Sequence, residues 1–246
     1  AYPYIAIPGH PIAMFYGHIF DGVYQYTDFD KVGESYILKD GVPNNGNARE
    51  KIQPGDIKFK DINRDGVVND YDLTIIGNPN PKHIGGFGNN FQYKNFDLNV
   101  FFQWSYGGDV LNANRIEFEG GDPNARTSLN MFASFANRWT PENQTNELYR
   151  IGGQGPAVYS SRTIEDGSFL RLKTVSLGYR LPNAWLKKIN IKSLRVYASA
   201  QNLITWTRYS GPDPEVSTRP TALTPSFDWS PYPRPRTLTL GVDISF

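Results

Sequence analysis

Apolar and polar residues alternate along several long stretches of the chain. The clearest is FDLNVFFQWSY at residues 96–106, where one set of alternate positions is apolar and the other is mostly polar. The apolar set is Phe96, Leu98, Val100, Phe102, Trp104 and Tyr106, and the other is Asp97, Asn99, Phe101, Gln103 and Ser105. A period of two predicts a β-strand whose two faces meet different surroundings.

Four further stretches predict strands with the same pattern. They cover 86–93, 167–181, 192–206 and the run RTLTLGVDISF at 236–246, and Lys94-Asn95 predicts a tight hairpin between the first two strands of the set. Most are about ten residues or longer, which suits a tilted membrane strand. Short turns alternate with the long polar connections 107–166 and 207–236. This asymmetry is typical of an outer-membrane β-barrel, whose strands give no hydropathy peak.

Composition narrows the functional classes. The 246 residues carry a net charge of +1 with scattered basic residues, which argues against nucleic-acid binding. Cysteine is absent, which excludes disulfides, thiol nucleophiles and cysteine metal sites. No apolar run approaches the roughly 18 to 20 residues of a membrane helix, and AYPYIAIPGHP does not read as a signal peptide. Phosphate-loop, nucleophile-elbow and metalloprotease motifs are also lacking, so we expect no enzyme.

The stretch DINRDGVVNDYD at residues 61–72 has the spacing of a calcium loop. The expected ligands at positions 1, 3, 5, 7, 9 and 12 are Asp61, Asn63, Asp65, Val67 through its carbonyl, Asn69 and Asp72. Gly66 allows the sharp turn, and oxygen ligands without His or Cys favour Ca²⁺ over zinc. Position 12 is Asp72 where Glu is usual, which makes two-point closure doubtful. An Asx-rich turn without metal is the alternative.

Other interpretations remain open at this point. A soluble β-sandwich would show the same alternation, and a calcium-stabilised sandwich that binds carbohydrate is the second functional hypothesis. A loop-borne glycosidase would use two of the carboxylates Asp213, Glu215, Glu165 and Asp166. Aromatic residues in or beside the long loops either stack on sugars or partner surfaces, or belong to membrane-interface girdles: Trp139, Trp206, Tyr209, Trp229 and Tyr232.

Six motifs in order resemble SusC/RagA-type TonB-dependent outer-membrane transporters. They are GDIKFKDINRDGVVNDYDLTIIGNPNPK, FQYKNFDLNVFFQWSYGGDVLN, RWTPEN, EDGSFLRLKTVSLGYRLP, LRVYASAQNLITWTRYSGPDPEV and YPRPRTLTLGVDISF, and together they cover about residues 50 to 246. The resemblance implies an all-β fold, the C-terminal part of a 22-stranded antiparallel transmembrane β-barrel with long extracellular loops. Residues 1–83 would form an extracellular loop region that contains the calcium-type loop, and 84–246 would supply the last strands.

The resemblance also implies a function. The full protein would import oligosaccharides or peptides through the bacterial outer membrane with a SusD-like surface lipoprotein, and TonB would act through an N-terminal plug that this chain lacks. Strand parity then places the acidic loop outside the cell, where a site of about 10⁻⁴ to 10⁻³ M suffices. Outer-membrane lipid would contact residues such as Phe96, Leu98, Phe102, Leu240 and Val242. Cargo-contacting residues are not predicted.

Overall fold

The computed structural model describes residues 3–120, 129–156, 159–187, 190–219 and 221–246. The chain divides into two compact units whose stretches interleave along the sequence. The loop unit contains residues 1–79, 109–165 and 216–231, and the strand unit contains residues 80–108, 166–215 and 232–246. Parts of the expected loops, 121–128, 157–158 and 220, lie outside the described residues.

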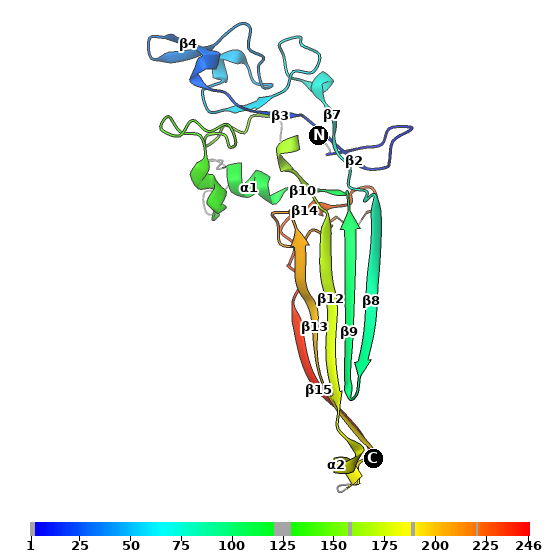
Figure 1. Cartoon of the computed structure of the whole chain (residues 1–246). Helices are drawn as coiled ribbons and strands as arrows, with labels where there is room; N and C mark the ends of the chain where they lie inside the picture. Colours follow the sequence, from blue (N-terminus) through cyan, green and yellow to red (C-terminus); the bar gives the residue numbers. More distant parts are fainter. Residues whose placement is uncertain (1–2, 121–128, 157–158, 188–189, 220) are drawn as a thin grey trace. The chain divides into compact units, whose positions relative to one another are not determined.

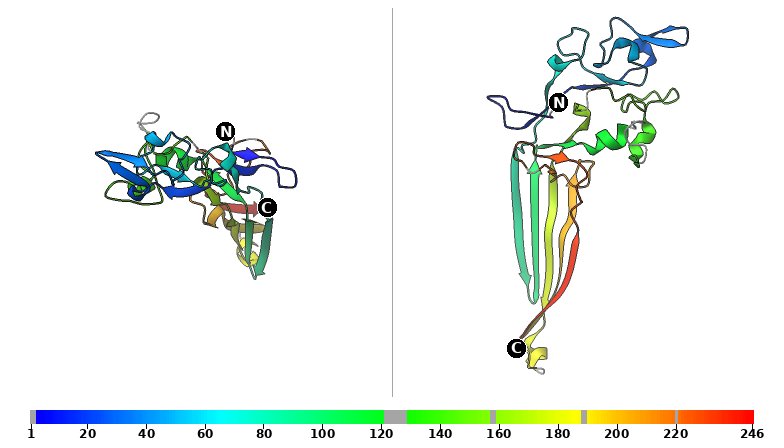
Figure 2. Two further views of the ribbon diagram at one scale, coloured as in Figure 1. Left: turned by 90° about the horizontal axis from the view of Figure 1, so that it is seen from above. Right: turned by 180° about the vertical axis from the view of Figure 1, so that it is seen from behind.

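A single five-stranded antiparallel sheet forms the strand unit (Figure 1). Its strands are β8 (His83–Tyr93), β9 (Phe96–Tyr106), β12 (Phe169–Arg180), β13 (Ser193–Thr207) and β15 (Thr237–Ser245), in the order β15-β13-β12-β9-β8. The lengths are 11, 11, 12, 15 and 9 residues, so the expected long strands are confirmed, with β15 slightly short of ten. Figure 2 shows the same row of strands from behind, with β8 and β15 at its two edges.

The two ends of the sheet differ. At one end, here the turn end, Tyr93 pairs with Phe96 across the two-residue turn, and Lys94 adopts a left-handed φ of 52°. The short helix α2 (Asn183–Leu186) joins β12 to β13 at this same end. The opposite end, here the loop end, is where the connections 107–168 and 208–236 leave the strands. The hairpin and the strand boundaries predicted from periodicity are therefore confirmed to within a few residues.

One irregularity interrupts the regular pairing near the loop end. The register of β12 against both β9 and β13 shifts between Leu172 and Thr174. Against β9 this leaves Lys173 as an extra residue on β12, whereas against β13 the extra residue is on β13, between Gln201 and Ile204. A bulge of this kind changes where the following side chains point and is common beside functional sites.

The loop unit is built from short elements. Its strands are β1 (Tyr4–Ile5), β2 (Met14–Gly17), β3 (Phe20–Val23), β4 (Phe29–Val32), β5 (Ser35–Leu38), β6 (Ile57–Phe59), β7 (Thr74–Gly77), β10 (Asp109–Asn112), β11 (Ile164–Asp166) and β14 (Phe227–Asp228). Its helices are α1 (Asn114–Gly120) and the 3₁₀ turns η1 (Tyr26–Asp28), η2 (Arg49–Lys51), η3 (Asp70–Asp72), η4 (Ala133–Asn137) and η5 (Ser161–Thr163). They pair as β1-β2-β7, β11-β10-β14, β3-β6 and β4-β5.

The buried side chains of the loop unit form small separate clusters. The largest joins distant stretches: Val23, Ile57, Phe59, Val68, Trp139, Leu148 and Tyr149. Trp139, one of the aromatic residues with an open role, is 5% exposed and belongs to this core. Within the described residues, none of the helices has the length and apolar character needed to cross a membrane.

Candidate functional site

The two faces of the five-stranded sheet have opposite chemistry. Register pairing aligns Phe91, Leu98, Leu177, Ala198 and Leu240 in one row across all five strands. Although apolar, this face is open: Leu177 is 49% exposed and Leu240 is 85% exposed. An apolar sheet face of this extent is unfavourable in water and suits contact with lipid.

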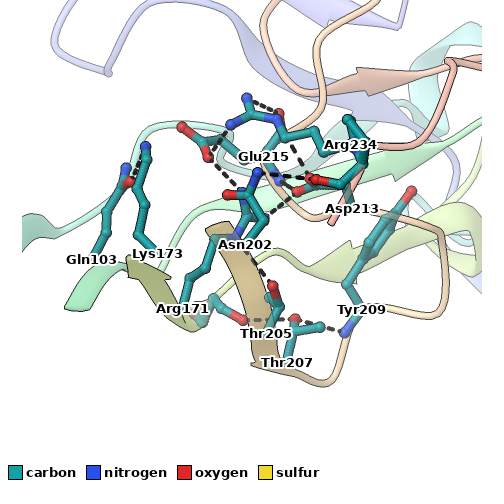
Figure 3. Close-up of polar contacts among 12 residues, drawn as sticks. Gln103, Arg171, Lys173, Asn202, Thr205, Thr207, Tyr209, Asp213, Glu215 and Arg234 are labelled. Atoms are coloured by element: carbon teal, nitrogen blue, oxygen red, sulfur yellow. Dashed lines mark hydrogen bonds and ion pairs between the residues drawn. The ribbon is translucent and has the colours of Figure 1, made fainter. Parts of the chain in front are cut away.

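Arg171 organises the opposite, polar face near the loop end (Figure 3). Its side chain is 1% exposed, and its Nε donates a hydrogen bond to Oγ1 of Thr205 at 3.0 Å. Its Nη1 and Nη2 donate to Glu215 Oε2 at 3.1 Å and Asp213 Oδ1 at 2.5 Å. A buried guanidinium requires such paired acceptors, because an isolated buried charge is costly.

A second arginine completes this cluster from the other end of the same loop. Arg234 donates from Nη1 to Glu215 Oε2 at 2.8 Å and lies 3.4 Å from Asp213 Oδ2 through Nε. Beside it, Asn202 donates to the carbonyl of Pro235 at 3.3 Å. The loop that joins β13 to β15 is thus held at both of its ends against the polar face. We call Arg171, Asp213, Glu215 and Arg234 the loop clamp.

Lys173 lies next to the loop clamp on the bulge of β12. Its Nζ donates to Gln103 Oε1 at 2.5 Å, and no carboxylate pairs with it among the described residues. Gln103 belongs to the polar positions of β9. Since the two arginines and two carboxylates of the clamp balance, Lys173 supplies a net positive charge beside them.

The turn end of the polar face carries another ion pair. Arg195 donates to both carboxylate oxygens of Asp97, at 2.9 and 2.6 Å, and to Asp243 at 3.2 Å. These charges therefore pair across strands β9, β13 and β15. A wall with polar, mutually paired charges on one side and exposed apolar groups on the other is what a water-filled barrel in a membrane requires.

The acidic loop 61–72 folds back on its own backbone. Asp61 accepts the N–H groups of Arg64 and Gly66 at 2.6 and 2.8 Å, and Asp65 accepts that of Val67 at 2.8 Å. Asp72 is fully buried and accepts N–H bonds from Ile62 at 2.7 Å and Asn69 at 2.9 Å. The carboxylates of the first and last acidic positions, Asp61 and Asp72, thus hold the loop backbone in a closed turn.

The two asparagines of this loop donate hydrogen bonds from their side-chain amides to oxygen atoms that are expected calcium ligands. Asn63 Nδ2 donates to Asp65 Oδ2 at 2.9 Å, and Asn69 Nδ2 donates to the Val67 carbonyl at 3.2 Å. Among the described residues, no three His, Cys, Asp or Glu side chains come together as a metal-binding group. A bound cation would therefore require these amides to turn their oxygens inward. The residue types fit calcium, and in this structure the loop's own amides donate to two of the expected ligand oxygens, Asp65 Oδ2 and the Val67 carbonyl.

The carboxylates considered for glycosidase chemistry are engaged elsewhere. Asp213 and Glu215 belong to the loop clamp, and Glu165 accepts a hydrogen bond from Asn112 at 3.0 Å and pairs with Arg115. Asp166 accepts the N–H of Ser168 at 2.9 Å. In the part of the chain that the structure describes, these contacts give no acid pair free to act on a glycosidic bond.

Sequence reasoning missed the basic residues that organise the polar face. Arg195 occupies a position that opposes the apolar set of its predicted strand, and this phase was the available signal. Arg171 and Lys173 share the odd-numbered phase of the apolar residues Val175 and Leu177, so periodicity assigns Arg171 to the wrong face, and only the bulge at Lys173 places it on the polar one. Their partners lie 42 and 98 residues away along the chain, for Asp213 and Asp97 respectively. Such pairings follow from the sheet register, which periodicity alone does not supply.

Comparison with known proteins identifies relatives over nearly the whole chain. The chain is 36% identical over 243 residues to the TonB-dependent receptor P3 of Formosa agariphila, a match that covers 97% of this chain and 22% of the relative. It is 32% identical over 200 residues to the TonB-dependent receptor SusC of Bacteroides thetaiotaomicron, covering 80% of this chain and 18% of SusC. No family model matches the sequence. The chain spans about a quarter or less of the length of these relatives.

Solved structures agree on the fold. The structure of the RagAB peptide transporter superposes with a TM-score of 0.69 at 24% identity, covering all of this chain and 24% of the matched chain. The fold expected from the sequence, strands of an outer-membrane β-barrel, is confirmed by this match, while the number of 22 strands is not tested. The chain belongs to the SusC/RagA-type family of TonB-dependent outer-membrane transporters.

Proposed function

We propose that this chain forms part of the wall of a 22-stranded outer-membrane importer, with its loop end outside the cell. The observation that carries the proposal is the single sheet with an exposed apolar face and a charged, internally paired polar face. The apolar face meets lipid, and the polar face lines the lumen through which cargo passes.

The sheet edges support a larger barrel. Strands β8 and β15 each pair with one neighbour within the sheet. Unpaired backbone groups are not tolerated in lipid, so both edges require partner strands from outside this chain. A soluble β-sandwich, the alternative, needs a second sheet over the apolar face, and the described residues do not supply one.

We further propose the cargo and partners of the whole protein. The cargo is oligosaccharides or peptides, a SusD-like surface lipoprotein covers the extracellular mouth, and TonB drives import through the plug domain. The relatives support this: they are named TonB-dependent receptors, and the neighbour in structure is a peptide transporter. Transport of this kind consists of binding, occlusion and release and requires no covalent catalysis.

Calcium binding by the loop 61–72 is a separate proposal. Its support is the donor set of Asp61, Asn63, Asp65, Asn69 and Asp72, which offers only oxygen and amide groups around a closed loop. Asp61, Asp65 and Asp72 would supply carboxylate oxygens and Val67 its carbonyl, as hard cations require. The bound ion would stiffen an extracellular loop.

The transport proposal also includes the expected division of the chain. Residues 1–83 form an extracellular region, and residues 84–246 supply barrel strands with the long extracellular loops 107–166 and 207–236.

Isolation of the native protein tests the transport proposal. A tagged protein is purified from its source membrane, and its mass and co-purifying chains are determined. We expect a polypeptide far longer than 246 residues that needs detergent and carries a surface lipoprotein. An unrelated tagged outer-membrane barrel from the same cells is the control for nonspecific capture. A detergent-free species of about 246 residues, alone, would contradict the proposal.

Uptake then separates the cargo classes. Cells with and without the intact protein are supplied with labelled neutral oligosaccharides or labelled peptides, and the same measurement is repeated in cells that lack TonB. We expect uptake of one class to require both the protein and TonB. Uptake of both classes that is unchanged by loss of the protein would contradict the assigned function.

A further inference from the structure

An open hollow of about 690 Å³ lies at the loop end of the sheet, across four adjacent strands. Its lining includes His83, Trp104, Tyr106, Leu170, Trp206 and Arg208. Trp104 pairs in register with Leu170, and Leu170 with Trp206, so these three side chains form one cross-strand row. The position of these three lining side chains is therefore fixed by the register of the strands.

This row belongs to the apolar face. Trp104 and Leu98 lie six residues apart on the uninterrupted strand β9, and side chains an even number of residues apart share a face. Leu98 is part of the apolar row described above. In the proposed membrane setting, on which this inference rests, the hollow faces outer-leaflet lipid, while cargo passes on the other side of the sheet.

The depth of the apolar face fits one leaflet of acyl chains. Trp104 and Phe96 are eight residues apart on β9. Eight steps span about 26 Å along a strand, or about 20 Å across a membrane after the usual tilt of about 40°. One leaflet of hydrocarbon is about 15 Å deep. A lipid with its head at Trp104 can therefore lay its chains along Leu98 and its neighbours.

Hydrogen-bond donors converge on the same hollow. Trp104 Nε1 donates to His83 Nδ1 at 3.1 Å, so a neutral His83 carries its proton on Nε2, where it can donate to a ligand. The His83 ring also stacks on Tyr106, with 5.1 Å between ring centroids. These contacts fix a donor at the rim of an aromatic surface.

Arg208 is the uncompensated cation of the hollow. It is exposed and forms no hydrogen bond or ion pair within the part of the chain that the structure describes. Asp166, which also lines the hollow, accepts the N–H of Ser168 and makes no ion pair with Arg208. A guanidinium offers a planar set of donors that matches the oxygens of a phosphate group.

We propose that this hollow binds the phosphate-bearing head group of an outer-leaflet lipid. Arg208 binds the phosphate oxygens, and His83 donates a further hydrogen bond. The rings of Trp104 and Trp206 lie at the boundary between the polar head and the acyl chains, where indoles are favoured. The site would hold one lipid against the loop end of the wall.

The test compares lipid binding by the full-length transporter and its Arg208→Gln variant. Purified protein in detergent is titrated with dioleoyl phosphatidic acid or with zwitterionic dioleoyl phosphatidylcholine, and bound lipids are counted by native mass spectrometry. We expect wild type to bind phosphatidic acid about three- to tenfold more tightly, the range for one partly exposed charged hydrogen bond. Arg208→Gln should reduce this preference to less than twofold.

Arg236→Gln is the matched control, because Arg236 is an exposed arginine directly before β15, at the same end of the sheet and outside the hollow. It should leave the preference for phosphatidic acid unchanged. An unchanged preference in Arg208→Gln, or an equal loss in both variants, would overturn the proposed site. A detergent requirement and a co-purifying lipoprotein in wild type test the transport proposal separately, so the two failures are distinguishable.

Discussion

Arg195 of β13 binds Asp97 of β9 through two hydrogen bonds, at 2.9 and 2.6 Å, although β12 lies between these strands. The residue of β12 beneath this contact is Gly178, which pairs with Asp97 in the register. A Cβ on Gly178 would collide with the Arg195 guanidinium. The absence of a side chain at one position thus permits an ion pair across three strands.

Gly178→Ala should therefore weaken the wall of the barrel. The added methyl group displaces Arg195 and leaves Asp97 without its two-point partner, so we expect a loss of about 1–3 kcal/mol in the free energy of unfolding. Urea unfolding of the full-length transporter in detergent measures it. Gly88→Ala is the control, because its Cβ would meet Phe101 at an ordinary 3.4 Å. Equal stability of the two variants would contradict the explanation.

Loss of the buried arginine should release the loop between β13 and β15. Arg171→Met leaves Asp213, which is 11% exposed, and Glu215 with Arg234 alone. Removal of one partner from a buried ion cluster costs about 3 kcal/mol, which corresponds to roughly 100-fold faster opening. Hydrogen exchange of residues 208–215 in the full-length protein measures this opening.

Arg234→Gln is the comparison for this measurement. Arg234 is 42% exposed, so its ion pairs are screened by solvent and should contribute less than about 1 kcal/mol. Exchange at 208–215 should then rise by less than about fivefold. If Arg234→Gln opened the loop as much as Arg171→Met, the buried arginine would not be the centre of the clamp.

Sequence alone predicts the sheet well because its determinants are local. The period of two assigns Leu98 and Leu177 to one face and Asp97 and Arg195 to the other, and the register confirms both assignments. Lys94-Asn95 predicts the hairpin because only two residues separate the alternating runs.

The polar contacts between strands and loops were not predictable in the same way. Arg171 meets Asp213 only because a bulge at Lys173 and the path of a long loop bring them together. The hollow beside Arg208 likewise depends on four strands ending at one level. Periodicity contains no information on how far a loop folds back, so these sites require the structure.

Acid should loosen helix α1 of the loop unit. Burial opposes the ionisation of Glu119, but Arg115 and Arg162 outweigh it and hold the Glu119 pKa below its usual value of 4.5. A carboxylate with a lowered folded-state pKa stabilises the fold above pH 4.5, and this contribution is lost as the pH falls through the folded-state pKa. Hydrogen exchange of residues 114–120, corrected for intrinsic rates, should therefore accelerate below about pH 4.5.

Two variants identify the responsible group. Glu119→Gln should expose α1 at pH 7 and remove most of the pH dependence, because Arg115 and Arg162 then lack their shared carboxylate. Glu142→Gln changes an exposed glutamate that makes no ion pair among the described residues, so its pH profile should match wild type. If exchange of residues 114–120 in Glu119→Gln still accelerated steeply below pH 4.5, the effect would belong to another carboxylate.

Calcium should stiffen the loop 61–72, and Gly66 should be required for its shape. Gly66 adopts a φ of 84°, and no atom lies within 4 Å of the point that a Cβ would occupy, so Ala at this position meets backbone strain without a collision. The strain is about 1 kcal/mol, so Gly66→Ala should bind calcium roughly fivefold more weakly. Titration calorimetry on the full-length protein, with protease resistance of the loop in calcium or in chelator, measures both effects.

Gly41→Ala is the control for Gly66→Ala, and Asp61→Ala tests whether the acidic loop is the calcium site. Gly41 also has open space around its Cβ position but no left-handed φ, so calcium affinity should stay unchanged. Asp61→Ala removes the carboxylate that accepts N–H bonds from Arg64 and Gly66, so both calcium binding and calcium-dependent protection should disappear. If wild type showed no calcium-dependent heat and the same proteolysis in chelator, residues 61–72 would form a metal-free turn that its own side-chain hydrogen bonds hold closed.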